Sequence, residues 1–166
     1  GTFSIDGGGD QKLLTFDLIK ILKENCLLPI VCAGGIMNGG DIVTYLNEGA
    51  AAVQMGTSFL CCDEAGTSPL HKKYVLEERQ RKTVYTKGFS GRWAQSIENE
   101  FTSSMECKYV LPFPLQNTLT NPLRKFAVKT GNGEYQSLWA GTEFKKARAL
   151  PAAELISQLV SEMGGS

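Results

Sequence analysis

Residues 30–40, IVCAGGIMNGG, constrain the fold more than any other part of this chain. A short apolar run, from Ile30 to Ala33, ends in the pair Gly34 and Gly35. A continuous apolar run of this length is typical of a strand that is buried on both faces of a parallel sheet. Asp41 comes next, where a carboxylate suits the positive end of a helix dipole. The stretch therefore predicts a buried strand, a bare glycine turn and a helix start in immediate succession.

The same arrangement recurs a little further along the chain. Residues 51–55, AAVQM, predict a second buried strand, which ends in Gly56 and Thr57. Apolar spacing predicts one helix over residues 13–25, and a further helix is expected from about 69 to 82. Strands that alternate with helices through short connections indicate an α/β fold with a parallel sheet. A right-handed crossover would bring the carboxyl ends of the two strands together, so their glycines would share one surface.

A surface of this kind suits a phosphate group. Glycine lets backbone N–H groups approach a ligand closely, and a helix N-terminus adds a positive dipole end. Thr57 could add a hydroxyl donor. The spacing matches neither a dinucleotide-binding GxGxxG nor a P-loop. For one glycine pair alone, a tight turn without a ligand is the simpler interpretation. Two pairs at adjacent strand ends favour a phosphate cradle, as is common after strands 7 and 8 of TIM barrels.

Composition narrows the class of protein. Apolar residues make up 42% of the 166 residues and charged residues 20%, with 17 basic and 17 acidic side chains. This balance argues against binding to nucleic acid or to an anionic membrane. No apolar run approaches the ~20 residues that span a bilayer. Five cysteines without a CxxC pair, and a single histidine, argue against a zinc site and for reduced thiols in a cytoplasmic protein.

The pattern changes after residue 83. A short strand is expected over residues 83–86, and prolines at 112, 114 and 122 interrupt the next region, leaving room for a helix over about 121–129. The tail from Pro151 has apolar residues at helical spacing, with the proline at position N1. His71, at the start of the helix expected over 69–82, has no evident carboxylate partner. We expect it to be an exposed helix residue rather than a catalytic base.

Longer stretches resemble one family. The sequence PIVCAGGIMNGGDIVTYLNEGAAAVQMGTSFLCCDEAGTSP resembles the C-terminal part of the nitronate monooxygenases, also called 2-nitropropane dioxygenases. GRWAQSIENEF and LWAGTEFKKARALPAAELI resemble later motifs of that family. The resemblance implies an α/β fold in which residues 1–82 are the C-terminal part of an FMN-binding TIM (β/α)8 barrel, carrying strands 7 and 8. Residues 83–150 would form a largely helical substrate or cover domain, and residues 151–166 a C-terminal helix.

The resemblance also assigns a cofactor site. It places the FMN phosphate on the residues at the two strand ends, Ala33, Gly34, Gly35, Gln54, Met55, Gly56 and Thr57. It assigns no catalytic residue and no metal ligand to this chain, because the family's catalytic histidine would lie upstream of Gly1. The implied reaction is oxidation of an alkyl nitronate or nitroalkane by dioxygen. The chain is then expected to be one piece of a larger protein, whose N-terminal part is a partner as a separate chain.

Other functions fit the same glycines. Another FMN barrel, such as an NAD(P)H-dependent enoyl-carrier-protein or quinone reductase, would share the phosphate site. A phosphate-binding module without catalysis, or a self-standing small domain, is a further alternative. Flavin held in a stable complex with an upstream chain would favour the enzyme over the module.

Overall fold

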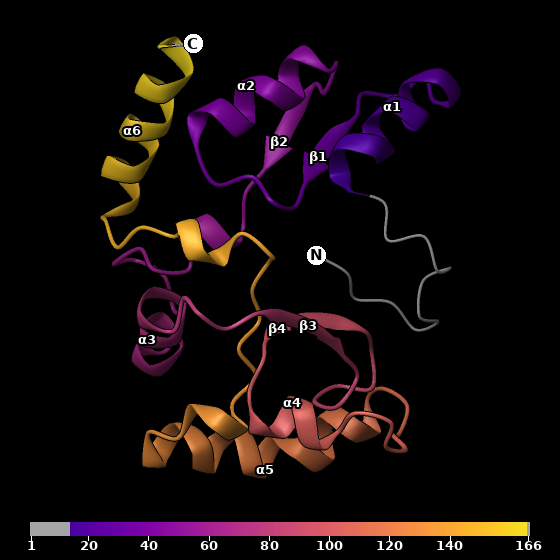
Figure 1. The fold of residues 1–166 in the computed structure, drawn as a ribbon, viewed down its shortest axis with the longest axis vertical. Helices are drawn as coiled ribbons and strands as arrows, with labels where there is room; N and C mark the ends of the chain where they lie inside the picture. The colour runs from indigo at the N-terminus through magenta and orange to yellow at the C-terminus, as the bar shows by residue number, and fades with distance from the viewer. Residues whose placement is uncertain (1–13, 166) are drawn as a thin grey trace. The chain divides into compact units, whose positions relative to one another are not determined.

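The computed structural model describes residues 14–165, so the glycine-rich loop expected over residues 1–10 lies outside the described residues. Figure 1 shows the helices and strands, which are, in chain order, α1 (Thr15–Asn25), β1 (Val31–Ala33), α2 (Gly39–Asn47), β2 (Ala52–Gln54), η1 (Thr57–Phe59), α3 (Pro69–Glu77), β3 (Thr83–Thr86), β4 (Ala94–Ile97), α4 (Glu100–Ser104), α5 (Leu115–Thr130), η2 (Gly133–Tyr135), η3 (Phe144–Lys146) and α6 (Ala152–Gly164). No helix of this described part could cross a membrane.

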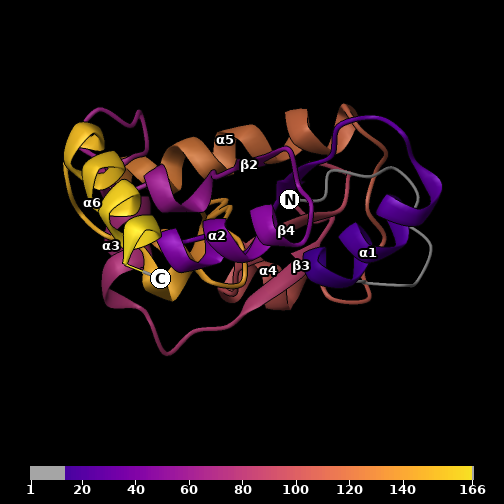
Figure 2. The ribbon, with the colours of Figure 1, turned by 90° about the horizontal axis from the view of Figure 1, so that it is seen from above.

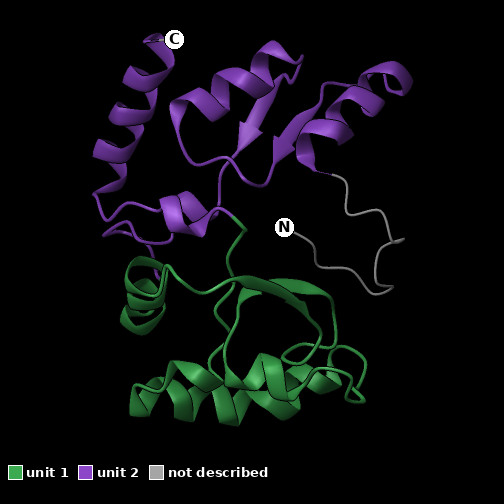
Figure 3. Cartoon of the chain, in the orientation of Figure 1, with its two compact units in different colours: residues 1–10, 67–142 green, residues 11–66, 143–166 purple. Residues whose placement is uncertain are grey.

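The described residues divide into two compact units (Figure 3). Unit 1 comprises residues 67–142, and unit 2 comprises residues 14–66 with 143–165. The sequence suggested limits at residues 82 and 150 instead. Because α3 groups with the later strands and residues 143–150 group with the glycine-bearing segment, the compact units differ from those limits. The functional division of the chain stays a prediction.

Unit 2 contains the predicted parallel strand pair, which is confirmed. Val31 pairs with Ala52 and Ala33 pairs with Gln54, with α2 as the crossover between the two strands. Helix α6 packs against α2 (Figure 1, Figure 2) and begins one position later than predicted, so that Pro151 is its N-cap. The buried core of the unit is formed by residues of α1, β1, α2, α6 and the loops between them. It consists of Ile19, Cys32, Ile36, Ile42, Ala50, Cys62, Leu155 and Leu159.

The two strands are not buried on both faces, as the sequence had predicted. Cys32 is buried, whereas Val31 is 58% exposed and Ala33 and Gln54 are also exposed. Successive side chains of a strand point to opposite faces, so one face of the pair lies on the core and the other is bare. Within the described residues only helices on the core side cover this sheet. The continuous apolar run from Ile30 to Ala33 is nonetheless typical of a strand with both faces covered.

Unit 1 is built around β3 and β4, which pair antiparallel from Thr83↔Ile97 to Thr86↔Ala94. The strand expected over residues 83–86 is confirmed. The preceding helix, α3, ends at Glu77 rather than near residue 82, because Glu78 already leaves the helical region of backbone angles. The short α4 begins at a capping box, in which Asn99 and Thr102 satisfy each other's backbone N–H groups.

Helix α5 is longer than the sequence indicated and contains a proline. It begins at Leu115 and includes Pro122, which had been expected to interrupt this region. Proline in a helix interior removes one backbone donor and disturbs the preceding turn. Arg124 bridges that turn, since its Nη2 lies 2.8 Å from both the carbonyl oxygen and Oδ1 of Asn117. This side chain links the turns before and after the proline.

Candidate functional site

The carboxyl ends of β1 and β2 lie side by side in unit 2. Since Ala33 is the register partner of Gln54, the chain leaves the two strands at Gly34 and Met55 at the same level of the sheet. Gly34 has φ +109° and Gly35 has φ +74°, both in the left-handed region that favours glycine. The turn after β1 thus requires its glycines for backbone reasons alone.

Gly56, after β2, is different. Its φ of −112° is open to any residue, and a Cβ placed on it would meet no heavy atom within 4 Å. Neither backbone strain nor packing therefore explains a glycine at this position. What its missing side chain provides is open space beside the strand ends. A ligand that approaches the backbone closely would use that space.

The backbone donors of this region fall into two groups. Two donors at the start of α2 are occupied: Asn38 Oδ1 accepts from the Asp41 N–H at 2.8 Å, and Glu162 Oε2 accepts from the Gly39 N–H at 2.7 Å. The Gly39 N–H and the Arg148 guanidinium hold the pKa of Glu162 below its usual value. By contrast, the N–H groups of Gly35 and Gly56 donate to no residue in the described chain. Free donors therefore lie in both glycine loops, beside a helix start that is already partly occupied.

Two hydroxyl groups fix these loops, and the sequence reasoning missed both. Ser58 is 2% exposed, and its Oγ donates to the carbonyl oxygen of Ile36 at 2.9 Å, which joins the loop after β2 to the loop after β1. Thr15 Oγ1, on α1, lies 3.3 Å from the carbonyl oxygens of both Ala33 and Gly34. Only the position of Ser58 directly after Gly56 and Thr57 could have suggested a role. Serine is common in turns, so that signal is weak.

His71 lies in unit 1 and is 8% exposed, so the prediction of an exposed histidine was wrong. Ser68 is the N-cap of α3 and accepts from the His71 N–H, and His71 and Val75, four residues apart, share the buried face of the helix. Burial lowers the pKa of His71, while a hydrogen bond to the Trp139 backbone acts in the opposite direction. Its Nε2 is buried without a hydrogen-bond partner among the described residues. The ring is therefore held in its neutral form.

Known proteins are similar to the chain over most of its length. A family model described as nitronate monooxygenase matches residues 4–162. The chain belongs to the nitronate monooxygenase family. A probable nitronate monooxygenase of Staphylococcus haemolyticus is 38% identical over 167 residues, which cover 98% of this chain and 46% of that protein. The chain thus spans about half the length of such relatives.

Solved structures agree with this membership of the nitronate monooxygenase family. The nitroalkane oxidase of Streptomyces ansochromogenes is 38% identical and superposes with a TM-score of 0.87, over 91% of this chain and 44% of that one. FabK of Thermotoga maritima is 26% identical with a TM-score of 0.75, over 93% of this chain and 50% of that one.

The fold brings together every residue assigned to the cofactor from the sequence. Ala33 ends β1 and is followed by Gly34 and Gly35, at the level where Gln54 ends β2 and is followed by residues 55–57. Ser58 and Thr15, which had not been assigned, each donate a hydrogen bond to a backbone carbonyl at or just after the end of β1. The cofactor role of these residues stays a prediction.

Proposed function

We propose that this chain is the C-terminal part of an FMN-dependent nitronate monooxygenase, with activity that requires the N-terminal part. Unit 2 would supply strands 7 and 8 of a (β/α)8 barrel, and unit 1 the cover over the substrate. The observation that carries the proposal is the pair of glycine-bearing strand ends at one level of the sheet. Gly56 is central, because a close ligand would use the space that its missing side chain leaves beside the strand ends.

The residues present fit the phosphate of FMN. The N–H groups of Gly35 and Gly56 would donate to its oxygens, with the Thr57 hydroxyl as a further donor. Ala33, Gln54 and Met55 bring the backbone to that point. The phosphate would be held mainly by neutral dipoles, since glycine loops after adjacent barrel strands bind phosphate in this way.

When bound, FMN would carry electrons from a nitronate or nitroalkane to dioxygen. This chain would bind and orient the cofactor and exclude water from the cover side. No acid–base residue of the chain is assigned to the reaction. The Ser58–Ile36 hydrogen bond would keep the two loops in position before the cofactor arrives.

The N-terminal part of the same protein, as a separate chain, is the proposed partner. Further barrel strands would pair with the outer edges of β1 and β2, which carry no other strand in the described residues. The bare face, with Val31 and Ala33 exposed, would then point into the barrel. The five cysteines form no disulfide, which is in keeping with the proposed cytoplasmic location.

A second candidate is another FMN barrel that consumes a nicotinamide, such as an NAD(P)H-dependent enoyl-carrier-protein or quinone reductase. The structural similarity to FabK is the observation that favours keeping it. Both candidates would use the same phosphate site. They differ in the electron donor, a nitronate or a nicotinamide, and in the electron acceptor, dioxygen or an enoyl thioester or quinone.

The test combines cofactor identification with oxygen consumption. The chain is purified together with its N-terminal part, the visible spectrum is recorded, and the cofactor is identified after heat release. We expect FMN, and dioxygen uptake that depends on an alkyl nitronate without NAD(P)H. Uptake that requires NAD(P)H would favour the second candidate. A colourless sample that takes up no FMN would contradict both.

A further inference from the structure

The short helix η3, Phe144–Lys146, lies against both glycine loops of the proposed phosphate cradle, and all of these residues belong to unit 2. It packs on η1, which begins at Thr57 directly after Gly56. Its N-cap, Glu143, lies beside the other loop, because a Cβ placed on Gly35 would be 3.9 Å from Glu143 Cγ. A charged side chain on η3 is therefore close to both halves of the cradle.

Lys146 is such a side chain. Its Nζ lies 2.9 Å from Glu143 Oε2. The hydrogen bond to Glu143 raises the pKa of Lys146, and the negative charge of Asp41 acts in the same direction. Asp41 is itself fixed to the loop after β1, since its Oδ2 accepts from the Met37 N–H at 2.9 Å. The ammonium group thus lies within electrostatic range of two carboxylates that border residues 35–37.

Arg148 is a second cation near this loop, but it already has a structural role. Its Nη1 lies 2.6 Å from Glu162 Oε1, and its Nη2 donates to the Met37 carbonyl oxygen at 3.1 Å. Arg148 therefore holds α6 to the loop before α2. The side chain of Lys146, in contrast, is 51% exposed. An ammonium group has three N–H donors, so Lys146 can keep its bond to Glu143 and still donate to a ligand.

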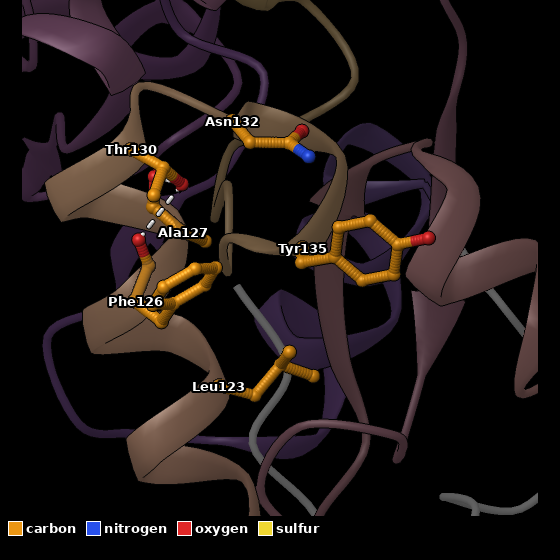
Figure 4. A pocket seen from close by; sticks show the side chains of 6 residues that line it. All are labelled: Leu123, Phe126, Ala127, Thr130, Asn132 and Tyr135. Atoms are coloured by element: carbon orange, nitrogen blue, oxygen red, sulfur yellow. Dashed lines mark hydrogen bonds between the residues drawn. The ribbon is translucent and has the colours of Figure 1, made fainter.

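A pocket in unit 1 offers an anion no such cation. Its volume is about 180 Å³ (Figure 4). It is lined by six uncharged residues, Leu123, Phe126, Ala127, Thr130, Asn132 and Tyr135. Of these two places, the cradle is therefore the one that suits a phosphate.

Glu143 makes the charge of Lys146 necessary at the cradle. A phosphate monoester carries about −1.5 to −2 charge at pH 7, and the carboxylate of Glu143 adds a further negative charge beside Gly35. Like charges at such short range repel each other. A cation that is held between them compensates both, and its hydrogen bonds to charged oxygens are strong ones.

We propose that Lys146 is a phosphate-binding residue of the FMN site, where its ammonium group donates to the phosphate and compensates the charge of Glu143. This inference rests on the function proposed above, and it adds one charged residue to a site formed by neutral backbone dipoles. Glu143 keeps the ammonium group beside the cradle, and a phosphate oxygen then shares it.

The test measures the dissociation constants of FMN and of riboflavin, which lacks the phosphate, for the chain together with its N-terminal part. Lys146→Met removes the charge and keeps the length of the side chain. Lys145→Met is the matched control, because Lys145 is also exposed and points another way in a helix of three residues per turn. We expect Lys146→Met to raise the dissociation constant of FMN about fivefold or more, and Lys145→Met to change it less than about twofold. Riboflavin binding should stay the same in both variants, which also shows that they are folded.

Glu143→Gln tests the sign of the effect. It removes the negative charge beside Gly35 and leaves the ammonium group, so FMN should bind about twofold more tightly or better, with riboflavin binding unchanged. An FMN affinity that Lys146→Met does not alter, an equal loss for riboflavin, or weaker FMN binding in Glu143→Gln would overturn the role of Lys146. A parent protein that binds no FMN would overturn the proposed function as well, so the two failures are distinguishable.

Discussion

The hydroxyl of Ser58 donates a 2.9 Å hydrogen bond to the carbonyl oxygen of Ile36, and this bond joins two loops that are distant in sequence. Ile36 directly follows Gly35, and Ser58 directly follows Thr57. The bond therefore ties together the two halves of the proposed phosphate cradle. Donors that are fixed in advance lose less conformational freedom on binding, which increases affinity.

Ser58→Ala should lower both stability and cofactor affinity. The change leaves the Ile36 carbonyl oxygen without its donor in a buried place, at a cost of about 1–3 kcal/mol in the free energy of unfolding. FMN affinity should fall several-fold as the loops loosen. Urea unfolding and fluorescence titration measure the two effects. Ser157→Ala, which alters an exposed hydroxyl within α6, is the control. Equal behaviour of the two variants would show that the bond does not organise the loops.

Gly34→Ala and Gly56→Ala should differ in their effect on the free energy of unfolding, although both add one methyl group beside the same site. Gly34 has φ +109°, and a Cβ there would lie 3.3 Å from Thr15 Oγ1, so alanine should destabilise by about 1–2 kcal/mol or more. At Gly56 alanine meets open space at an ordinary φ, and the change should stay within about 0.5 kcal/mol. Urea unfolding of the two variants measures this difference in the free energy of unfolding. A large loss for Gly56→Ala would mean that its glycine is structural after all.

His71 should make stability depend on pH. Burial lowers its pKa below the unfolded value of 6.5, so the unfolded chain binds the proton more tightly than the folded one. The stabilising effect is present above pH 6.5 and is lost as the pH falls from there through the folded pKa. Because His71 is the chain's single histidine, one imidazole resonance in a proton NMR titration reports the folded pKa directly.

His71→Gln is the control for that pH dependence. Its free energy of unfolding should change less than that of the parent chain between about pH 7 and pH 5, since no imidazole titrates near 6.5. An NMR pKa at or above 6.5 would contradict the buried neutral ring.

The sequence pattern was sufficient to predict the strands and turns that depend on neighbouring residues alone. Apolar runs that end in glycine were sufficient to predict β1, β2 and their parallel pairing at the level of Gly34 and Met55. The exposure of Val31 could not be predicted, because it depends on what covers the second face of the sheet. Pro122 lies inside α5 rather than at its start, which spacing rules for proline do not predict.

Side chains that act through tertiary contacts were likewise missed. His71 shares the buried face of α3 with Val75, and the sequence periodicity of this helix is too weak to show which face is buried. Ser58 supports the candidate site through one bond to a loop 22 residues earlier. The positions of the glycines at the ends of β1 and β2 were predictable, because an apolar run followed by glycine is visible in the sequence.

The most direct test of the account is the affinity of the chain, together with its N-terminal part, for FMN and for riboflavin, which lacks the phosphate. Gly56→Asp would place a carboxylate in the proposed phosphate site. Gly66→Asp is the matched control, because Gly66 is also exposed and a Cβ on it also meets nothing within 4 Å. We predict that Gly56→Asp weakens FMN binding about tenfold or more through like-charge repulsion, leaves riboflavin binding unchanged, and that Gly66→Asp alters neither. Unchanged FMN affinity in Gly56→Asp, or an equal loss for riboflavin, would contradict a phosphate site at these strand ends.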